Sequence, residues 1–502
     1  MTQNNKYEKY TEKVKNMSVL GGVMGLLHWD EQLFLPAGSR KARQKQMSAM
    51  AKILHELATS KEYGKLIYDL YEMGQEKFDP YAWKNITESK KAYDESTKVP
   101  QELLEESVVL GMQGYNAWEQ ARKKNEYSSY ASIIKKWVEL RKKIASHIYP
   151  DKHPYDVCLD GYEDGLSREI IDAIFERLKP GLVELCKKIM SSKTRIPTLP
   201  LINLEVDKQK ELNRRIIMDL GFDFNYGCFA VSAHPFSGRV HNTDVRMTTR
   251  YRENDYFSSM MSAIHETGHA IYDQARAGSE YDGLPVNESL GMLMHESQSL
   301  LWERLVAQSK CFWYYLCPLL EEYFPGKFKG YSAEDFYRST NKFQPTLIRL
   351  DADEVTYHFH IIIRYEIEKL LFDDRVKVEE LPELWNNMYE ELLGIRPPTD
   401  SEGILQDVHW ADGGFGYFPS YSLGAMYGAQ FFHTAKKEIP EMEEEFKSGN
   451  YKPLKDWLNE KVHKMGRLYR AGELIKRVTG RYLDTDSYLA YLTEKYGGIY
   501  AL

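Results

Sequence analysis

Apolar side chains recur at three- and four-residue steps through most of this 502-residue sequence, which is the spacing of amphipathic helices. The pattern is clearest over residues 101–125, 127–149 and 352–373. Ser332 and Asp335 form a candidate capping box that marks the start of a further helix. Pro180 interrupts the pattern over 167–190 and predicts two short helices there. Helical spacing on this scale predicts a mainly α fold.

One segment, residues 227–251, departs from the helical pattern. It is rich in β-branched and aromatic residues, and its side chains alternate with a period of two over 244–251. Ser237-Gly238 and Asn242-Thr243 provide turn residues. We therefore predict a small antiparallel β-sheet built as a hairpin. No linker follows it, so the sheet is expected to lie beside the next helix.

Composition and charge exclude several classes of partner and location. Lys and Arg number 66 and Asp and Glu 74, so the net charge of −8 gives no basis for binding nucleic acid or an anionic membrane. No segment has the ~20 apolar residues of a membrane helix. The five cysteines are irregularly spaced without a C-x-x-C pair, and residues 1–15 lack a signal peptide pattern. These features predict one domain over 1–502 in the cytoplasm.

The string from Met260 to Tyr272 carries the clearest chemical signal, an H-E-x-x-H pattern inside a helical stretch. His265 and His269 are four residues apart, so both imidazoles lie on one helix face and can bind one zinc ion. Glu266 is rotated by about 100° and is expected to act as general base toward a water molecule at the metal. We expect one zinc per chain, or another divalent ion such as cobalt in its place.

A catalytic zinc commonly has a third protein ligand, which we expect on a second helix over 285–308. Glu288 lies 19 residues after His269 and Glu296 lies 27 after it. Glu288 falls in the first turn of the predicted helix, where acids are common because of the helix dipole. Glu296 falls mid-helix, where a solvated glutamate is less expected. The residues favour Glu296 and leave Glu288 as the alternative, with Asp273 as a candidate carboxylate behind a histidine.

Further strings place the chain in a family context. Residues 265–269 read HETGH and residues 295–299 read HESQS. The sequence also contains His234-Pro235-Phe236, Asp244-Val245-Arg246-Met247-Thr248, Ile348-Arg349-Leu350-Asp351-Ala352-Asp353 and Gly403-Ile404-Leu405-Gln406-Asp407-Val408-His409-Trp410. Together these motifs resemble the carboxypeptidase Taq family of zinc metallocarboxypeptidases over nearly the whole chain. The resemblance implies a large single-body helical metallopeptidase with a deep groove, usually a homodimer, that removes C-terminal residues from peptides. It also supports Glu296 as the third ligand.

A carboxypeptidase has to recognise a free α-carboxylate, and arginine suits this through its bidentate fork. Arg349 is the first candidate and Arg246 the second. Structural ion pairs are the alternative for both, Arg349 with Asp351 or Asp353 and Arg246 with Asp244.

His409 and Tyr421 are candidate donors to the oxyanion of the tetrahedral intermediate, because a neutral donor near zinc can stabilise that charge. The alternative for both is ordinary core packing. We therefore predict a zinc metallocarboxypeptidase of broad specificity that acts on peptides with a free C-terminal carboxylate. The alternatives are a zinc oligopeptidase that cuts inside short peptides and an inactive peptide-binding scaffold, which would be expected to have lost Glu266 or a ligand.

Overall fold

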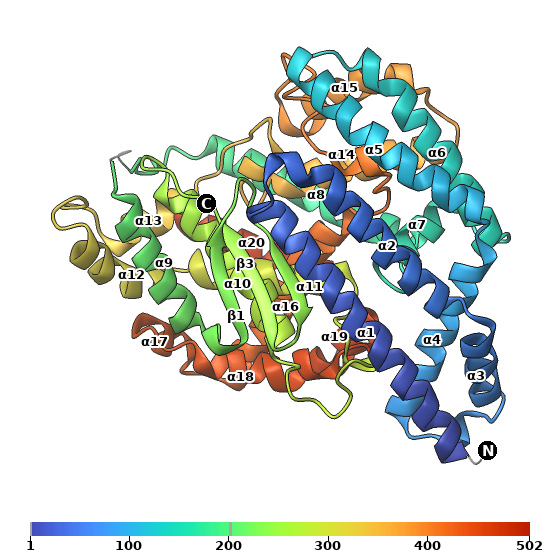
Figure 1. Cartoon of the computed structure of the whole chain (residues 1–502). Helices are drawn as coiled ribbons and strands as arrows, with labels where there is room; N and C mark the ends of the chain where they lie inside the picture. The colour runs from blue at the N-terminus through green and yellow to red at the C-terminus, as the bar shows by residue number, and fades with distance from the viewer. Residues whose placement is uncertain (1–2, 200–202) are drawn as a thin grey trace.

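Helices form most of the computed structural model, which describes residues 3–199 and 203–502 (Figure 1). The first nine helices are α1 (Gln3–Leu33), α2 (Arg40–Ala58), α3 (Lys61–Tyr71), α4 (Pro80–Lys98), α5 (Gln101–Lys124), α6 (Ser128–Ile148), α7 (Pro154–Tyr162), α8 (Arg168–Ser191) and α9 (Val206–Leu220). The remainder are α10 (Tyr256–Gln274), α11 (Met292–Leu300), α12 (Lys310–Tyr323), α13 (Ala333–Thr340), α14 (Tyr357–Phe372), α15 (Leu381–Leu393), α16 (Pro419–Glu438), α17 (Met442–Lys447), α18 (Lys452–Lys461), α19 (Ala471–Thr479) and α20 (Thr485–Tyr500). The mainly α prediction is confirmed.

Most helix predictions from spacing match observed elements. The capping box at Ser332 and Asp335 is present at the start of α13, with each side chain bonded to the other residue's backbone N–H. The predicted break at Pro180 is wrong, because α8 continues through it. Six apolar side chains on both sides of the proline are buried: Ile171, Phe175, Leu178, Leu182, Leu185 and Ile189. At about 1.5–3 kcal/mol for each buried side chain, their burial outweighs the ~3 kcal/mol cost of an internal proline.

The predicted sheet exists and has three strands, β1 (Gly227–Val231), β2 (Ser237–His241) and β3 (Asp244–Thr249). β2 and β3 form the expected antiparallel hairpin around Asn242-Thr243. β1 pairs with β3 in parallel, so the strand order is β1-β3-β2 and the sheet is mixed. Ser237-Gly238 is not a turn, because both residues pair with β3. The connection over 232–236 instead reverses the chain.

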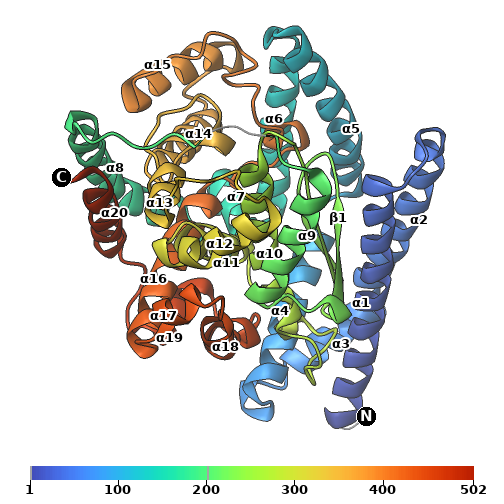
Figure 2. The same cartoon turned by 90° about the vertical axis from the view of Figure 1, so that its left-hand side faces the viewer.

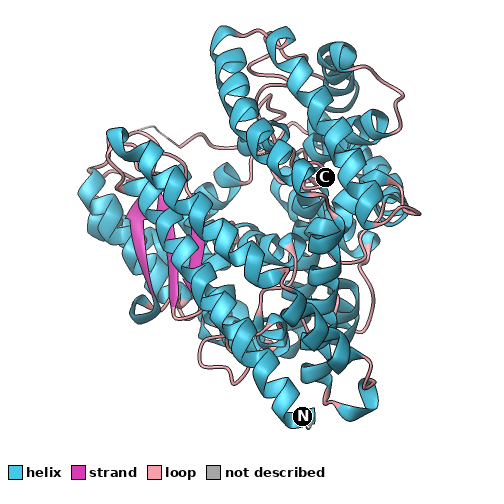
Figure 3. Ribbon diagram, turned by 45° about the vertical axis from the view of Figure 1, so that its right-hand side comes forward, coloured by secondary structure: helices cyan, strands magenta, loops and turns pink. Residues whose placement is uncertain are grey.

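The sheet lies between α1 and α10, which ties the N-terminal helices to the rest of the molecule (Figure 3). Val245 and Met247 of β3 share a small buried cluster with Ala263 and Ala270 of α10. On the other side, α1 approaches β2 so closely that a Cβ at Gly22 would lie 2.8 Å from the Val240 carbonyl oxygen. Helices α1 and α2 run side by side and form an outer wall of the molecule (Figure 2).

Helix α11 is shorter than the predicted helix over 285–308. Residues 285–287 form a 3-10 turn, 288–291 are not helical, and α11 continues into η5, a π-helical turn at Leu301–Ala307. Side chains bind backbone carbonyls just before α11: Arg276 donates to Asn287, the last residue of the 3-10 turn, at 3.0 Å, and Arg467 donates to Ser289 in the non-helical segment at 2.8 Å. Glu288 consequently precedes the helix, where its carboxylate pairs with Arg239.

Three central helices, α10, α11 and α16, approach one another through glycines. A Cβ at Gly268 of α10 would lie 2.6 Å from the carbonyl oxygen of Gln298 in α11. A Cβ at Gly424 of α16 would lie 2.9 Å from Cβ of Glu296. Because neither glycine carries a side chain, the backbones pack closely, and side chains from all three helices meet in one place.

None of the helices within residues 3–199 and 203–502 combines the length and the apolar composition that crossing a membrane requires.

Candidate metal centre

His265 and His269 lie one turn apart on α10, whose start is capped by the Asp255 carboxylate accepting the Ser258 N–H at 3.3 Å. Opposite them, Glu296 of α11 is buried, and its Oε2 lies 3.9 Å from Nε2 of His265 and 3.6 Å from Nε2 of His269. One ligand atom from each of the three residues lies within 4.8 Å of the other two. The structure thus brings together the three residues predicted as metal ligands.

These donors fit a divalent metal of the zinc type. Two imidazole nitrogens and one carboxylate oxygen are a ligand set used by catalytic zinc. Donors about 2.0–2.2 Å from a tetrahedral ion lie roughly 3.4 Å apart, close to the separations of 3.6 and 3.9 Å found here. Nδ1 of His265 contacts Glu303 and Nδ1 of His269 contacts His295, so both Nε2 atoms are left facing Glu296. A buried carboxylate needs a cationic or hydrogen-bonding partner, and a metal ion would provide a cation for Glu296.

Glu266 lies beside this group and is mostly buried, with 8% of its surface exposed. Burial raises the pKa of Glu266 to about 7, with His265 and Ser237 opposing the shift and the carboxylate of Glu296 adding to it. The carboxyl group can therefore hold or release a proton near neutral pH. This is the position that H-E-x-x-H spacing predicts for the general base.

His409 and Tyr421 are adjacent, as predicted, with Nε2 of His409 3.3 Å from the Tyr421 hydroxyl. His409 begins the 3-10 turn η8 (His409–Asp412), and Tyr421 is in the first turn of α16, three residues before Gly424. Burial lowers the pKa of His409 to about 4, although Asp407 opposes the shift. Burial also raises the pKa of Tyr421 well above 10. Both side chains are therefore neutral donors near pH 7.

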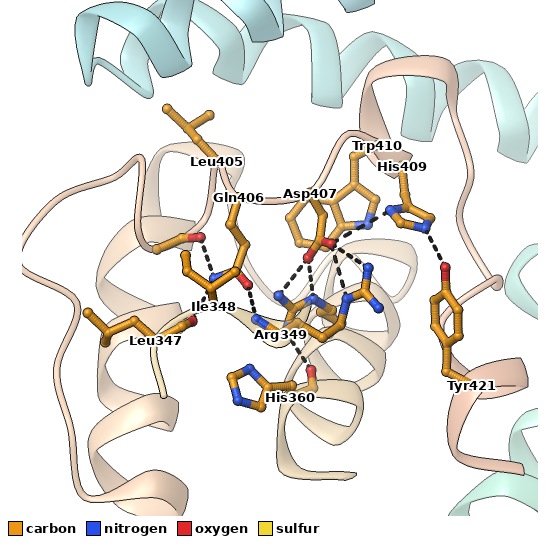
Figure 4. A network of polar contacts seen from close by, with 12 residues as sticks. Leu347, Ile348, Arg349, His360, Leu405, Gln406, Asp407, His409, Trp410 and Tyr421 are labelled. Carbon is orange, nitrogen blue, oxygen red and sulfur yellow. Dashed lines mark hydrogen bonds and ion pairs between the residues drawn. The ribbon is translucent and has the colours of Figure 1, made fainter. Parts of the chain in front are cut away.

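Arg349 does not pair with Asp351 or Asp353, the two partners considered from the sequence. Its Nε and Nη2 donate to one oxygen of Asp407 at 3.1 and 2.9 Å, while Arg364 donates to the other oxygen (Figure 4). Two guanidinium groups share one carboxylate, so a positive charge remains in a buried site. The Arg349 guanidinium also lies 4.6 Å from the centre of the Tyr421 ring.

Arg246 forms a bidentate pair with Asp244 in β3, at 2.8 Å for both bonds, and lies 5.7 Å from the centre of the Trp29 ring. This is the ion pair named above as the alternative for Arg246. His234 donates no side-chain bond among the described residues; its carbonyl oxygen accepts the Ser232 hydroxyl at 2.6 Å.

Three acidic residues important to this region were not singled out from the sequence. Glu303 contacts His265, Asp407 binds both arginines, and Glu368 of α14 accepts from Trp410, Gly416 and Tyr155 at 2.6–2.8 Å. Of these, Asp407 lies within the family motif over 403–410, and that position is the only indication of its role in the sequence. Asp273, the candidate carboxylate behind a histidine, contacts neither proposed ligand directly; it lies 3.5 Å from His295, which contacts His269, and it pairs with Arg276.

The helical fold and the buried His-His-Glu group define a metallopeptidase site, and comparison with known proteins identifies the family. The model of the carboxypeptidase Taq (M32) metallopeptidases matches residues 9–496. Carboxypeptidase 1 of Bacillus subtilis is 37% identical over 99% of each chain, and thermostable carboxypeptidase 1 of Thermus thermophilus is 34% identical over 100% of each. The crystal structure of the M32 carboxypeptidase from Deinococcus radiodurans matches with a TM-score of 0.95 at 33% identity, covering 99% of this chain and 100% of that one.

The chain therefore belongs to the carboxypeptidase Taq (M32) family and is a metallocarboxypeptidase. Membership of a metallopeptidase family implies a divalent metal, and the His-His-Glu group is where the described residues could hold one.

Proposed function

We propose that this enzyme hydrolyses the C-terminal peptide bond of peptides, with broad specificity, and uses one zinc ion held by His265, His269 and Glu296. The observation that carries the proposal is the convergence of two unengaged Nε2 atoms on a buried carboxylate. Bound there, zinc supplies a Lewis acid that polarises the scissile carbonyl and makes a water molecule more acidic.

Glu266 is the group placed to move the proton. Glu266 follows His265 on α10. Because one residue rotates a helix by about 100°, its carboxylate lies next to the proposed ligands but on a different side from the Nε2 atoms of His265 and His269. We propose that its carboxylate accepts a proton from the attacking water and returns it to the leaving amine.

His409 and Tyr421 act on the carbonyl oxygen of the scissile bond. Their contact at 3.3 Å places two neutral donors together. Donors held in a buried site stabilise the charge that develops on an oxyanion, because they need no reorganisation during the reaction.

Arg349 is proposed to bind the terminal carboxylate of the peptide. It is 5% exposed, and Asp407 fixes its Nε and Nη2 while Nη1 has no hydrogen-bond partner among the described residues. Because Arg364 shares Asp407, the pair does not cancel the positive charge at this point. Arg246 remains the second candidate, although its fork is engaged by Asp244.

A matched pair of peptides tests the function. We expect the enzyme to release the last residue from a peptide with a free C-terminus and to cleave the C-terminally amidated peptide far more slowly. Glu266→Gln should bind zinc and stay folded, with kcat lowered by at least about 10²–10⁴-fold, because the amide cannot accept a proton. Equal cleavage of both peptides at an internal bond would favour an oligopeptidase, and near-normal kcat in the variant would remove Glu266 as the base.

We also propose a homodimer in the cytoplasm. All five cysteines are free, as expected for a reducing compartment. Val108, Val109, Met112 and Tyr115 expose apolar surface along one side of α5, which a second copy could cover. Sedimentation of the wild type and Met112→Glu tests this arrangement: the wild type should sediment as a dimer and the variant should shift toward the monomer.

A further inference from the structure

We infer that Glu303 and the His295–Asp273 pair are positioning residues that hold the two zinc histidines from behind, and that Glu303 on the π-helical turn is the more important. The inference rests on the proposed zinc site and adds the residues that prepare it. None of the three is a proposed ligand.

Glu303 lies behind His265 rather than beside its free nitrogen. Its Oε2 is 2.7 Å from Nδ1 of His265, whereas Glu296 faces Nε2 of the same ring. A neutral imidazole carries one N–H and one lone pair. When the proton on Nδ1 is donated to a carboxylate, the lone pair is on Nε2, which is the arrangement needed for metal binding.

The helix geometry explains how Glu296 and Glu303, on one continuous helix, lie at opposite nitrogens of the His265 ring. Glu296 is in α11 and Glu303 is in η5, the π-helical turn that continues it. A π turn spaces its hydrogen bonds at five residues, so each side chain after it is rotated relative to its place in a regular α-helix. Such turns often occur at functional sites. Here the turn carries Glu303, and the carboxylate reaches the far nitrogen of His265.

His269 is held differently, through a second histidine. Its Nδ1 lies 2.9 Å from Nδ1 of His295, and Nε2 of His295 lies 3.5 Å from Asp273. Asp273 can accept only from an N–H on Nε2 of His295, which leaves Nδ1 of His295 free to accept from His269. The direction of this chain again leaves the lone pair of His269 on Nε2. Arg276 keeps Asp273 in place through a buried ion pair.

Glu303 should hold His265 more strongly than the His295–Asp273 pair holds His269. A hydrogen bond to a charged carboxylate is roughly twice as strong as a neutral one. Glu303 contacts His265 directly at 2.7 Å, whereas Asp273 reaches His269 only through the His295 ring, which lies 3.5 Å from it. Loss of Glu303 should therefore weaken zinc binding more than loss of His295.

The test is zinc affinity, measured by competition with a chelator on the purified full-length chain. Glu303→Ala should weaken zinc binding by about 10- to 100-fold. Glu303→Gln should weaken it less, because its amide oxygen can still accept a hydrogen bond from the Nδ1–H of His265, and His295→Ala should also weaken it less than Glu303→Ala. Glu288→Gln is the matched control, because Glu288 is a glutamate just before α11 that contacts Arg239 and neither histidine. This variant should leave the zinc affinity unchanged. Circular dichroism and thermal unfolding establish that each variant is folded.

Two results would overturn the inference. If folded Glu303→Ala binds zinc as tightly as Glu288→Gln, then Glu303 does not position His265 for metal binding. If it loses zinc as completely as Glu296→Ala, Glu303 is a ligand and not a positioning residue. Either result leaves the proposed function standing as long as the wild type binds one zinc and cleaves free-acid peptides, whereas a wild type without stoichiometric zinc would refute the function itself.

Discussion

Replacing Gly268 by alanine should separate α10 from α11 and disturb the metal centre from within the H-E-x-x-H segment. The added Cβ would lie 2.6 Å from the Gln298 carbonyl oxygen and 2.7 Å from Cα of Ser299. Both neighbours are backbone atoms, which cannot rotate away. Restoring an ordinary contact of 3.4 Å requires the helices to separate by about 0.8 Å at this point.

Two opposing free energies determine the effect on stability. Alanine in a helix interior is favoured over glycine by about 1 kcal/mol, whereas overpacking a tight contact costs about 1–3 kcal/mol. The net expectation is a loss of up to about 2 kcal/mol. Glu296 moves with α11, and a misplacement of about 1 Å can lower a rate by ~10²-fold. The loss of kcat/KM should therefore exceed what the change in stability alone would produce.

Gly21→Ala provides the matched control. Gly21 is inside α1 and has no atom within 4 Å of an added Cβ, so this variant should gain about 0.5–1 kcal/mol from helix propensity without a clash. Thermal unfolding of both variants, with hydrolysis of a free-acid peptide, is the assay. If Gly268→Ala is as stable as Gly21→Ala and keeps full activity, the close approach of α10 and α11 does not position Glu296.

Three further predictions address the ligand, the substrate and pH. Glu296→Ala should release zinc and Glu288→Ala should not, as measured by elemental analysis; the reverse result would exchange their roles. Arg349→Ala should lower kcat/KM for free-acid peptides by about one to two powers of ten, because a charge-assisted hydrogen bond contributes about 1.5–3 kcal/mol, and Arg349→Lys should restore it only in part. A folded Arg349→Ala enzyme that prefers free acids as strongly as the wild type would make Arg246 the next candidate. Burial lowers the pKa of His358 to about 3, so this residue stabilises the fold above pH 6.5 and loses that contribution as pH falls toward 3, by about 1.4 kcal/mol per pH unit. The difference in unfolding free energy between wild type and His358→Gln should change by about 1.0 kcal/mol from pH 6.5 to 5.5, where the unfolded histidine goes from half to mostly protonated, and a constant difference would contradict it.

Sequence spacing located the candidate metal centre because its first two proposed ligands are close together in the chain. His265 and His269 are one turn apart, so any helix through them places both imidazoles on one face. The capping box of α13 and the hairpin turn at Asn242-Thr243 were predictable for the same reason, since each depends on neighbouring residues.

Other features depend on residues distant in sequence, and sequence reasoning missed them. The pairing of Arg349 with Asp407 joins positions 58 residues apart, and nothing in local spacing favours it over the nearby Asp351 and Asp353. The start of α11 depends on Arg276 and Arg467, which satisfy the carbonyl groups that a helix would otherwise use. Proline at 180 predicted a break that buried apolar contacts overrode.

The sequence by itself determined the class of chemistry, the likeness to a carboxypeptidase family, and the mainly α fold. The tertiary structure decided which glutamate faces both histidines, which group lies behind each ring, and which carboxylate engages Arg349. The physical reason is the range of each interaction. Helical spacing and caps act within about one turn of chain, whereas the ligand group, its holders and the arginine pair form only when α10, α11 and α16 pack closely through Gly268 and Gly424.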